Sequence, residues 1–207
     1  MTSTELDTKL MTELKMALKK HCDNYGKIDT HEEQKNVYEF FRGMPVKPPY
    51  STMCQDILLK WRGRYGEENG PTSLRKLLQE ADEGAKDDAH TRALNDRATL
   101  HSCGHEILLP SALLFRGTGR EKDKVEEFTA TSMSLRAAMK YMTPFMIIYV
   151  PDQKVYGLVV REMATGGYDD EGGVDGTDKD CEILLLRPTL VKCSDEMRNK
   201  IVDFIIT

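Results

Sequence analysis

The hydrophobic pattern of this 207-residue chain changes at Gly104, and that change limits the folds open to it. Before Gly104, apolar residues recur every three or four positions, as at Leu10, Leu14 and Leu18, which is the spacing of one helix face. After it, they form short continuous runs such as 183–186, which are typical of buried strands. Helices followed by strands predict an α+β fold rather than an alternating βαβ fold.

Local signals place the individual elements. Thr30 followed by Glu33 resembles a capping box, and Gly26 and Gly43 stand where two helices are expected to end. Further helices are expected over residues 51–61, 74–78, 89–100 and 134–142, and strands over 107–115, 127–131, 145–150, 155–160, 182–186 and 201–206. We therefore predict a helical N-terminal lobe, residues 1–105, followed by a mostly β core, residues 106–207.

Composition and charge narrow the partners and the compartment. The net charge of -5 gives no overall basic surface for a phosphate backbone, so nucleic acid is not expected. The five cysteines are odd in number and irregularly spaced, which favours reduced thiols. No secretion signal or membrane helix of roughly 20 apolar residues is recognisable. We expect a cytoplasmic protein without a membrane partner, expressed in a host cell or delivered into one.

Polar side chains stand at the ends of three expected strands. Arg116 precedes Gly117, which allows close approach of a ligand, and its guanidinium suits a phosphate, although a surface ion pair is the ordinary alternative. Ser132 stands between a strand and a helix, where a hydroxyl binds a ligand or caps the helix. Glu182 opens a strand two residues after Asp180, and this pair suits catalysis or a solvated strand end.

Three further patterns have ordinary explanations. Arg42 repeats the Phe-Arg-Gly sequence, but it stands in the last turn of an expected helix, where a cation favours the dipole. Glu182 also completes the second half of a calcium loop whose first half lacks ligands. His101, Cys103 and His105 alternate as on one strand face, but no fourth zinc ligand has a telling spacing. We therefore predict no metal.

The order of these motifs resembles that of the ADP-ribosyltransferases of the arginine, serine, glutamate class. In that family, a strand ending in aromatic-Arg-Gly is followed by Phe-X-Ser-Thr-Ser entering a helix, and later by Glu-X-Glu or Gln-X-Glu opening an apolar strand. The corresponding stretches are 114–118 (Leu-Phe-Arg-Gly-Thr), 128–132 (Phe-Thr-Ala-Thr-Ser) and 180–185 (Asp-Cys-Glu-Ile-Leu-Leu). The resemblance covers residues 106–207.

The resemblance implies a core of two antiparallel sheets packed at a steep angle, with NAD bound between them as a substrate. Glu182 would hydrogen-bond the ribose 2′-hydroxyl and stabilise the oxocarbenium-like charge as nicotinamide leaves. Arg116 would hold the phosphates, while the hydroxyls near Ser132 would line the nicotinamide ribose and help to fix Glu182. The complete set expected to bind NAD is Arg116, Gly117, Thr118, Thr131 and Ser132.

The acceptor side follows from the same resemblance. Asp180 sits where the family places the residue that engages the acceptor, and Tyr168 lies in the loop, 166–179, that corresponds to target recognition. Members with a carboxylate at the Asp180 position usually modify arginine, because a carboxylate pairs with a guanidinium. We expect transfer of ADP-ribose to an arginine of a target protein, as toxins and effectors do, and a basic target surface would suit the acidic loop.

Departures from the family pattern keep alternatives open. Ala130 replaces the first serine of Ser-Thr-Ser, Asp180 is shorter than the usual glutamate or glutamine, and Arg116 stands unusually near the hydroxyl motif. The imperfect acceptor position suggests an NAD glycohydrolase, in which water takes the ADP-ribose. The substitutions together suggest a catalytically degenerate module of the same fold that binds a partner.

Overall fold

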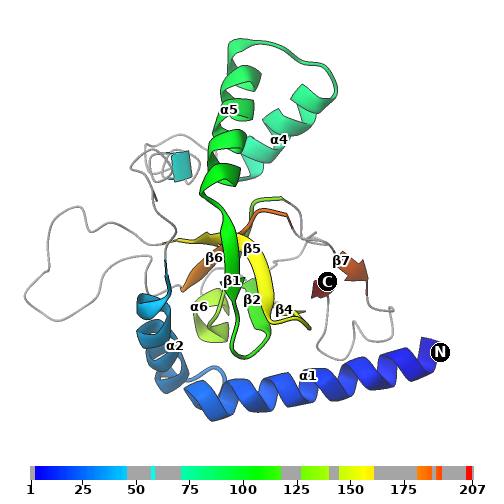
Figure 1. The fold of residues 1–207 in the computed structure, drawn as a ribbon, viewed down its shortest axis with the longest axis vertical. Coiled ribbons are helices and arrows are strands. Elements are labelled where there is room, and N and C mark those ends of the chain that lie inside the picture. The colour runs from blue at the N-terminus through cyan, green and yellow to red at the C-terminus, as the bar shows by residue number, and fades with distance from the viewer. Residues whose placement is uncertain are drawn as a thin grey trace, which may run out of the picture.

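The structure is a computed structural model that describes residues 3–45, 57–58, 71–117, 127–139, 145–160, 181–187, 190–192 and 204–206. Its helices in these ranges are α1 (Ser3–Tyr25), α2 (His31–Gly43), α4 (Pro71–Asp82), α5 (Asp88–Cys103) and α6 (Leu135–Met139). Its strands are β1 (His105–Leu108), β2 (Leu113–Gly117), β3 (Thr129–Ser132), β4 (Phe145–Tyr149), β5 (Lys154–Val159), β6 (Glu182–Leu185), β7 (Leu190–Lys192) and β8 (Phe204–Ile206). The α1–α2 pair and the α4–α5 hairpin lie at opposite ends of the sheet (Figure 1).

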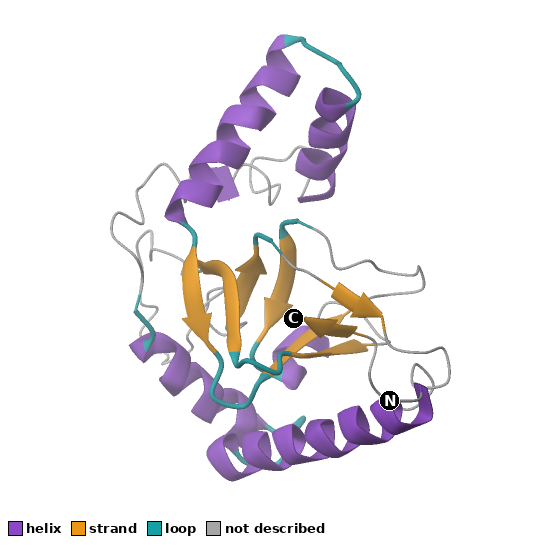
Figure 2. Ribbon diagram, turned by 45° about the vertical axis from the view of Figure 1, so that its right-hand side comes forward, coloured by secondary structure: helices purple, strands orange, loops and turns teal. Residues whose placement is uncertain are grey.

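The described strands form one eight-stranded sheet in the order β1-β5-β6-β3-β2-β4-β8-β7. Neighbours are antiparallel except β4 and β8, which are parallel. Helices at the N-terminus and a largely antiparallel sheet confirm the α+β class. The expected pair of separate sheets is not observed, because β2 bonds to both β3 and β4 and so joins the two halves. That junction is narrow: β2 and β3 pair only through Phe115 and Ser132. Figure 2 shows the strands of the two halves running in different directions.

The backbone geometry confirms the predicted end of the first helix and the predicted start of the second. Gly26 has a φ of 96°, which favours glycine, and its N–H donates to the Cys22 carbonyl at 2.8 Å, closing the end of α1. At the start of α2, the Thr30 hydroxyl accepts from the Glu33 N–H at 3.1 Å. Arg42 lies in the last turn of α2, as predicted. Of the helix predicted over 51–61, only Ile57 and Leu58 are described, and both are helical.

The single strand predicted over 107–115 was wrong, because a turn divides it into β1 and β2. Pro110 cannot donate to a ladder, and Ala112 takes a φ of 58°, outside the strand region. The Ala112 N–H closes the turn by donating to the Leu109 carbonyl at 2.9 Å. β7 was not predicted, since three residues carry too little periodicity.

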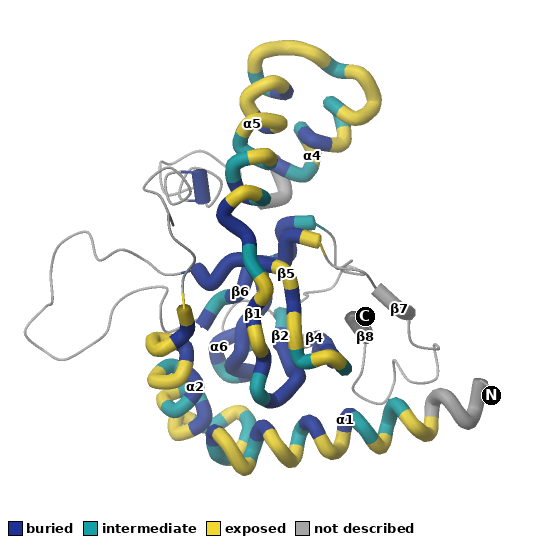
Figure 3. The backbone as a smooth tube through the Cα atoms, viewed as in Figure 1, coloured by how far each residue is buried: buried dark blue, intermediate teal, exposed yellow. Residues whose placement is uncertain are grey.

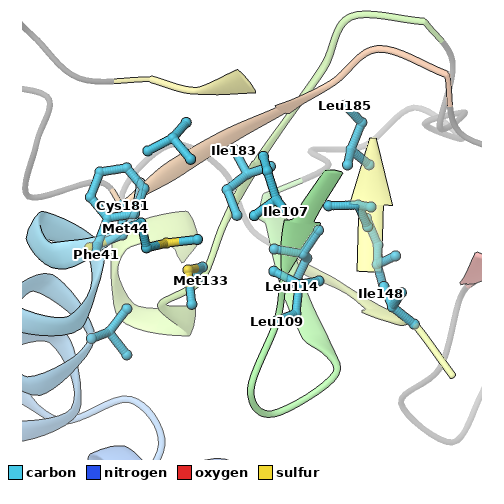
Figure 4. Close-up of a cluster of buried hydrophobic side chains, with 14 of the residues drawn as sticks. Phe41, Met44, Ile107, Leu109, Leu114, Met133, Ile148, Cys181, Ile183 and Leu185 are labelled. Carbon is cyan, nitrogen blue, oxygen red and sulfur yellow. The ribbon is translucent and has the colours of Figure 1, made fainter. Parts of the chain in front are cut away.

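Both faces of the sheet carry buried side chains, although β1 and the first half of β5 also carry exposed ones (Figure 3). Alternate residues along β5 and β6 belong to different hydrophobic clusters, because successive side chains point to opposite faces. The first cluster packs one face against α2, and Figure 4 shows Phe41 of that helix and Met44 just after it near Cys181 and Met133. On the other face, α4 and α5 form a second cluster with β5 and β6, and α1 and α6 form a third with β2 and β4.

Every one of these clusters contains residues from both sides of the predicted boundary at 105. Leu14 of α1, for example, belongs to the same cluster as Leu113 and Phe115 of β2. The division into two domains stays a prediction, but the described helices and strands share their cores. None of the described helices has the length and apolar character needed to cross a membrane.

The cysteines differ in part from the expectation of reduced thiols. Cys22 and Cys181 are free, as expected. Cys103 at the end of α5 is disulfide-bonded, and its partner lies outside the described residues. The expectation was therefore wrong for Cys103, because irregular spacing in the sequence does not decide which thiols meet in space.

Gly157 of β5 provides a test of the sheet packing. A Cβ added there would lie 2.6 Å from the backbone carbonyl oxygen of Leu184 in the neighbouring strand, where little can move aside. Gly157→Ala is expected to lower the free energy of unfolding by about 1–3 kcal/mol, measured by urea denaturation. Gly43→Ala is the matched control, because nothing lies within 4 Å of its added Cβ. It should be neutral or stabilise α2, and equal losses in the two variants would contradict this packing.

His90 fastens α4 to α5. Its Nδ1–H donates to Asp87 at 2.6 Å and its Nε2–H to Glu80 at 3.1 Å. The hydrogen bond to Glu80, followed by that to Asp87, raises the pKa of His90 above its ordinary 6.5. The contribution of His90 to stability is therefore complete below about pH 6.5 and is lost as pH rises through the raised pKa of the folded state.

We therefore expect His90→Gln to reduce the free energy of unfolding more at about pH 6 than at about pH 9. Glu80→Gln should weaken this pH dependence, because it removes the largest cause of the shift. Glu83→Gln is the control, since Glu83 bonds to Gln79 rather than to His90. Denaturation curves across this pH range give the free energy of unfolding of the wild type and the three variants. A destabilisation by His90→Gln that grows with pH would contradict the predicted sign.

Candidate functional site

The predicted site residues lie on three adjacent strands. β3 occupies the place between β2 and β6 in the sheet, so the strands carrying Arg116, Ser132 and Glu182 are neighbours. Arg116 is the penultimate residue of β2, Ser132 ends β3 and Glu182 begins β6. The antiparallel pairing of β3 and β6 brings the end of one strand beside the start of the other. Segments that are far apart in the sequence thus converge on β3.

Ser132 and Glu182 stand directly opposite each other in the β3–β6 ladder. Directly opposite residues of an antiparallel pair place their side chains on the same face. Ser132 is buried, and Glu182 is partly exposed at the end of the strand. The Ser132 hydroxyl also accepts from the Ser134 N–H at 3.0 Å, so the predicted capping role is present. The capping role is thus observed, and the same hydroxyl lies across from Glu182. Binding of a ligand by Ser132 stays a prediction.

Ala130 stands opposite Leu184, two residues along the ladder from Glu182. A serine at 130 would stand directly opposite that leucine and diagonal to Glu182 on the same face. The departure from Ser-Thr-Ser at Ala130 therefore leaves a hydroxyl opposite Glu182, namely that of Ser132.

The Thr131 side chain points to the face of β3 opposite to that of Ala130 and Ser132. It pairs with Ile183, and its hydroxyl donates to the Ile183 carbonyl at 2.7 Å in a buried position. This bond ties β3 to β6 just beside the pair formed by Ser132 and Glu182. A role for Thr131 in binding NAD stays a prediction.

Arg116 reaches across to β3. Its Nη1–H donates to the Ala130 carbonyl at 2.7 Å, and the side chain is partly buried. Because Phe115 is the β2 partner of Ser132, the next residue, Arg116, leaves the sheet on the face of Thr131 and not on the face of Ser132 and Glu182. The bond holds its guanidinium against the middle strand of the three. Gly117 follows in the same strand and pairs with Phe145 of β4.

The backbone takes an unusual form just before Glu182. Cys181 has a φ of 47°, a left-handed conformation that is uncommon outside glycine and costs about 1–3 kcal/mol. The surrounding bonds hold it, because the Met133 N–H donates to the Cys181 carbonyl at 3.1 Å and the Val160 N–H to the Glu182 carbonyl at 3.0 Å. Cys181 is fully buried. The direction in which Glu182 enters β6 is therefore fixed from both neighbouring strands.

The remaining predicted residues are those outside the described ranges and the candidate zinc ligands. Thr118, Tyr168 and Asp180 lie outside the described residues, so their predicted roles stay predictions. Of the candidate zinc ligands, Cys103 is in the disulfide and the His101 ring bonds to Glu127. Within the described ranges, no group of histidine, cysteine and carboxylate side chains is arranged to hold a metal ion.

Sequence reasoning missed a buried polar cluster beside Ser132. Its members are His21 of α1, Glu33 of α2, Ser111 before β2 and Ser134 before α6, and each is at most 1% exposed. The Ser134 hydroxyl donates to Glu33 Oε2 at 2.8 Å. We call this set the Glu33 cluster. The available signal was His21, a polar residue three and four positions from Leu18 and Ala17 on the apolar stripe of α1.

Tyr25 of α1 contacts Cys181, the residue just before Glu182. It packs in the first cluster with Cys181, and burial raises the pKa of Tyr25 to about 12, with the nearby Cys181 contributing. Its hydroxyl is buried without a hydrogen-bond partner in the described part of the chain. The end of α1 therefore lies against the residue that precedes Glu182.

No family model matches this chain, and comparisons with curated proteins and with solved structures found no match. The functional interpretation consequently rests on the arrangement of these side chains.

Proposed function

We propose that this chain transfers ADP-ribose from NAD to a protein side chain, with arginine favoured, and releases nicotinamide. The observation that carries the proposal is the placement of Glu182 opposite Ser132 in the β3–β6 ladder, with Arg116 bonded to the same middle strand. These are the three positions that the resemblance to ADP-ribosyltransferases singles out. The narrow junction between the two halves of the sheet also suits a core that divides into two parts around NAD.

In the proposed reaction, the bond between C1′ of the ribose and the nicotinamide nitrogen breaks, and nicotinamide leaves with the electron pair. Positive charge then develops on C1′ and the ring oxygen. The Glu182 carboxylate would hydrogen-bond the 2′-hydroxyl and stabilise that charge. Arg116 would bind the phosphates with its planar donors. Asp180 would pair with a guanidinium of the target, whose nitrogen would attack C1′ and pass its proton to the Asp180 carboxylate.

The decisive variant is Glu182→Gln, which keeps the shape of the side chain and removes its charge. We expect nicotinamide release and labelling of target proteins to fall by about a hundredfold or more, because the developing charge loses its stabilising carboxylate. The measurement is transfer of labelled ADP-ribose from NAD in a cell lysate, followed by mass spectrometry of the acceptor. Glu106→Gln is the matched control, since Glu106 pairs with Lys154 in another part of the sheet. Unchanged transfer by Glu182→Gln would falsify the proposal.

The two Phe-Arg-Gly sequences allow a matched test of NAD binding. Arg116→Ala is expected to raise the KM for NAD by about tenfold or more, because a charge-assisted contact to phosphate is lost. Arg42→Ala should leave the KM unchanged, since Arg42 lies over the Tyr38 ring at the end of α2. Circular dichroism checks that both variants fold. Equal KM values would remove Arg116 from the proposed site.

The wild-type assay separates the alternatives. Nicotinamide release without labelling of any protein would identify a glycohydrolase, with water as the acceptor. Calorimetry that detects no NAD binding at millimolar concentration would instead indicate a degenerate module.

A further inference from the structure

The Glu33 cluster links the N-terminal helices to the strand that carries Ser132. His21 Nε2 lies 3.1 Å from Glu33 Oε1, and His21 Nδ1 lies 3.1 Å from the Ser111 hydroxyl. The other carboxylate oxygen of Glu33 accepts from Ser134. One buried carboxylate therefore joins α1, α2 and the segment that connects β3 to α6.

Burial decides what this cluster does. A serine, a histidine and a glutamate in hydrogen-bonding sequence also occur in hydrolytic triads. Here the serine is 1% exposed and the histidine and glutamate are fully buried, so no substrate reaches them. Burying a carboxylate carries a large desolvation cost, which is offset only by hydrogen-bond partners that are held in place. The cluster therefore fixes positions and does not carry out chemistry itself.

The hydrogen bonds continue from Glu33 to the β3–β6 ladder. Ser134 donates its hydroxyl to Glu33 and its N–H to the Ser132 hydroxyl, and it accepts from the Ala137 N–H at 3.3 Å. Ser132 is the residue opposite Glu182. A shift of Glu33 is thus passed to the side chain across from the glutamate through a single residue.

Aromatic contacts of α1 reinforce the same point. The His21 ring packs edge to face on Phe115, with ring centroids 5.3 Å apart, and Phe115 is the β2 partner of Ser132. Tyr25 lies beside Cys181 at the start of β6. Helix α1 therefore contacts the β2 partner of Ser132 on one side and the residue that precedes Glu182 on the other.

We propose that Glu33 is a positioning residue: through Ser134 and Ser132, it holds Glu182 in the orientation needed for catalysis. On this view, α1 and α2 belong to the active site and are not an accessory lobe. The structural coupling stands on the contacts above, and its catalytic consequence rests on the proposed function.

The test compares Glu33→Gln and Ser134→Ala with Asn36→Ala. Asn36 of α2 donates to the Tyr25 carbonyl at 3.0 Å, so its loss weakens the same helix pair without touching Ser134. Hydrogen exchange followed by mass spectrometry reports on the coupling whether or not the protein is an enzyme. We expect amides of residues 129–137 and 181–185 to exchange about tenfold faster in Glu33→Gln and Ser134→Ala, and to be unchanged in Asn36→Ala.

Kinetics test the catalytic part. Both cluster variants should lower kcat for nicotinamide release by about tenfold to a hundredfold while leaving the KM for NAD within about twofold, because the Arg116 guanidinium is held by the Ala130 carbonyl, outside the Glu33 cluster. Ser134→Thr retains the hydroxyl and should restore kcat. Losses that follow the melting temperature equally in all variants, Asn36→Ala included, would overturn the proposal. If the wild type releases no nicotinamide, the proposed function fails, but the exchange rates still decide whether Glu33 is coupled to β6.

Discussion

The pairing of β3 with β6 is the interaction on which the rest of this structure depends. It connects the strands on the α4–α5 side with those that pack on α1, because among the described strands β3 alone bonds to both β6 and β2. The same ladder determines which side chains meet. A slip of one residue would turn Glu182 to the other face and place an apolar side chain opposite Ser132. The buried residues on both faces of β6 prevent such a slip.

Local elements were largely predictable from the sequence, because their signals are local. Gly26 and Thr30 mark helix ends through their own backbone needs, and the apolar run after Glu182 marks β6. The strand over 107–115 was misread because hydrophobicity alone does not reveal the turn around Pro110. Pairing was not predictable, since the register of β3 against β6 depends on segments far apart in the chain.

The candidate site was likewise predictable in its local features but not in its pairing. That Arg116, Ser132 and Glu182 stand at strand ends follows from the sequence, but that Ser132 rather than residue 130 faces Glu182 does not. Glu33 was assigned to a capping box, and only the backbone half of that box is present. Its carboxylate instead enters the core toward His21 and Ser134, where tertiary partners outweigh the local motif. Capping rules describe the helix end correctly but do not predict the direction that a long side chain takes.

The order of the strands also governs how this protein is made. One ladder partner of each of β3 and β4 comes late in the chain, since Thr129 pairs with Leu185 and Ile148 with Phe204. Contacts between distant segments carry a large loop-closure entropy and slow folding. During synthesis, α1 and α2 leave the ribosome before the strands and keep their apolar faces exposed until the strands that cover them follow. A ribosome that stops before residue 182 would therefore release a chain with its middle strand half paired, prone to aggregation and without the carboxylate at its centre.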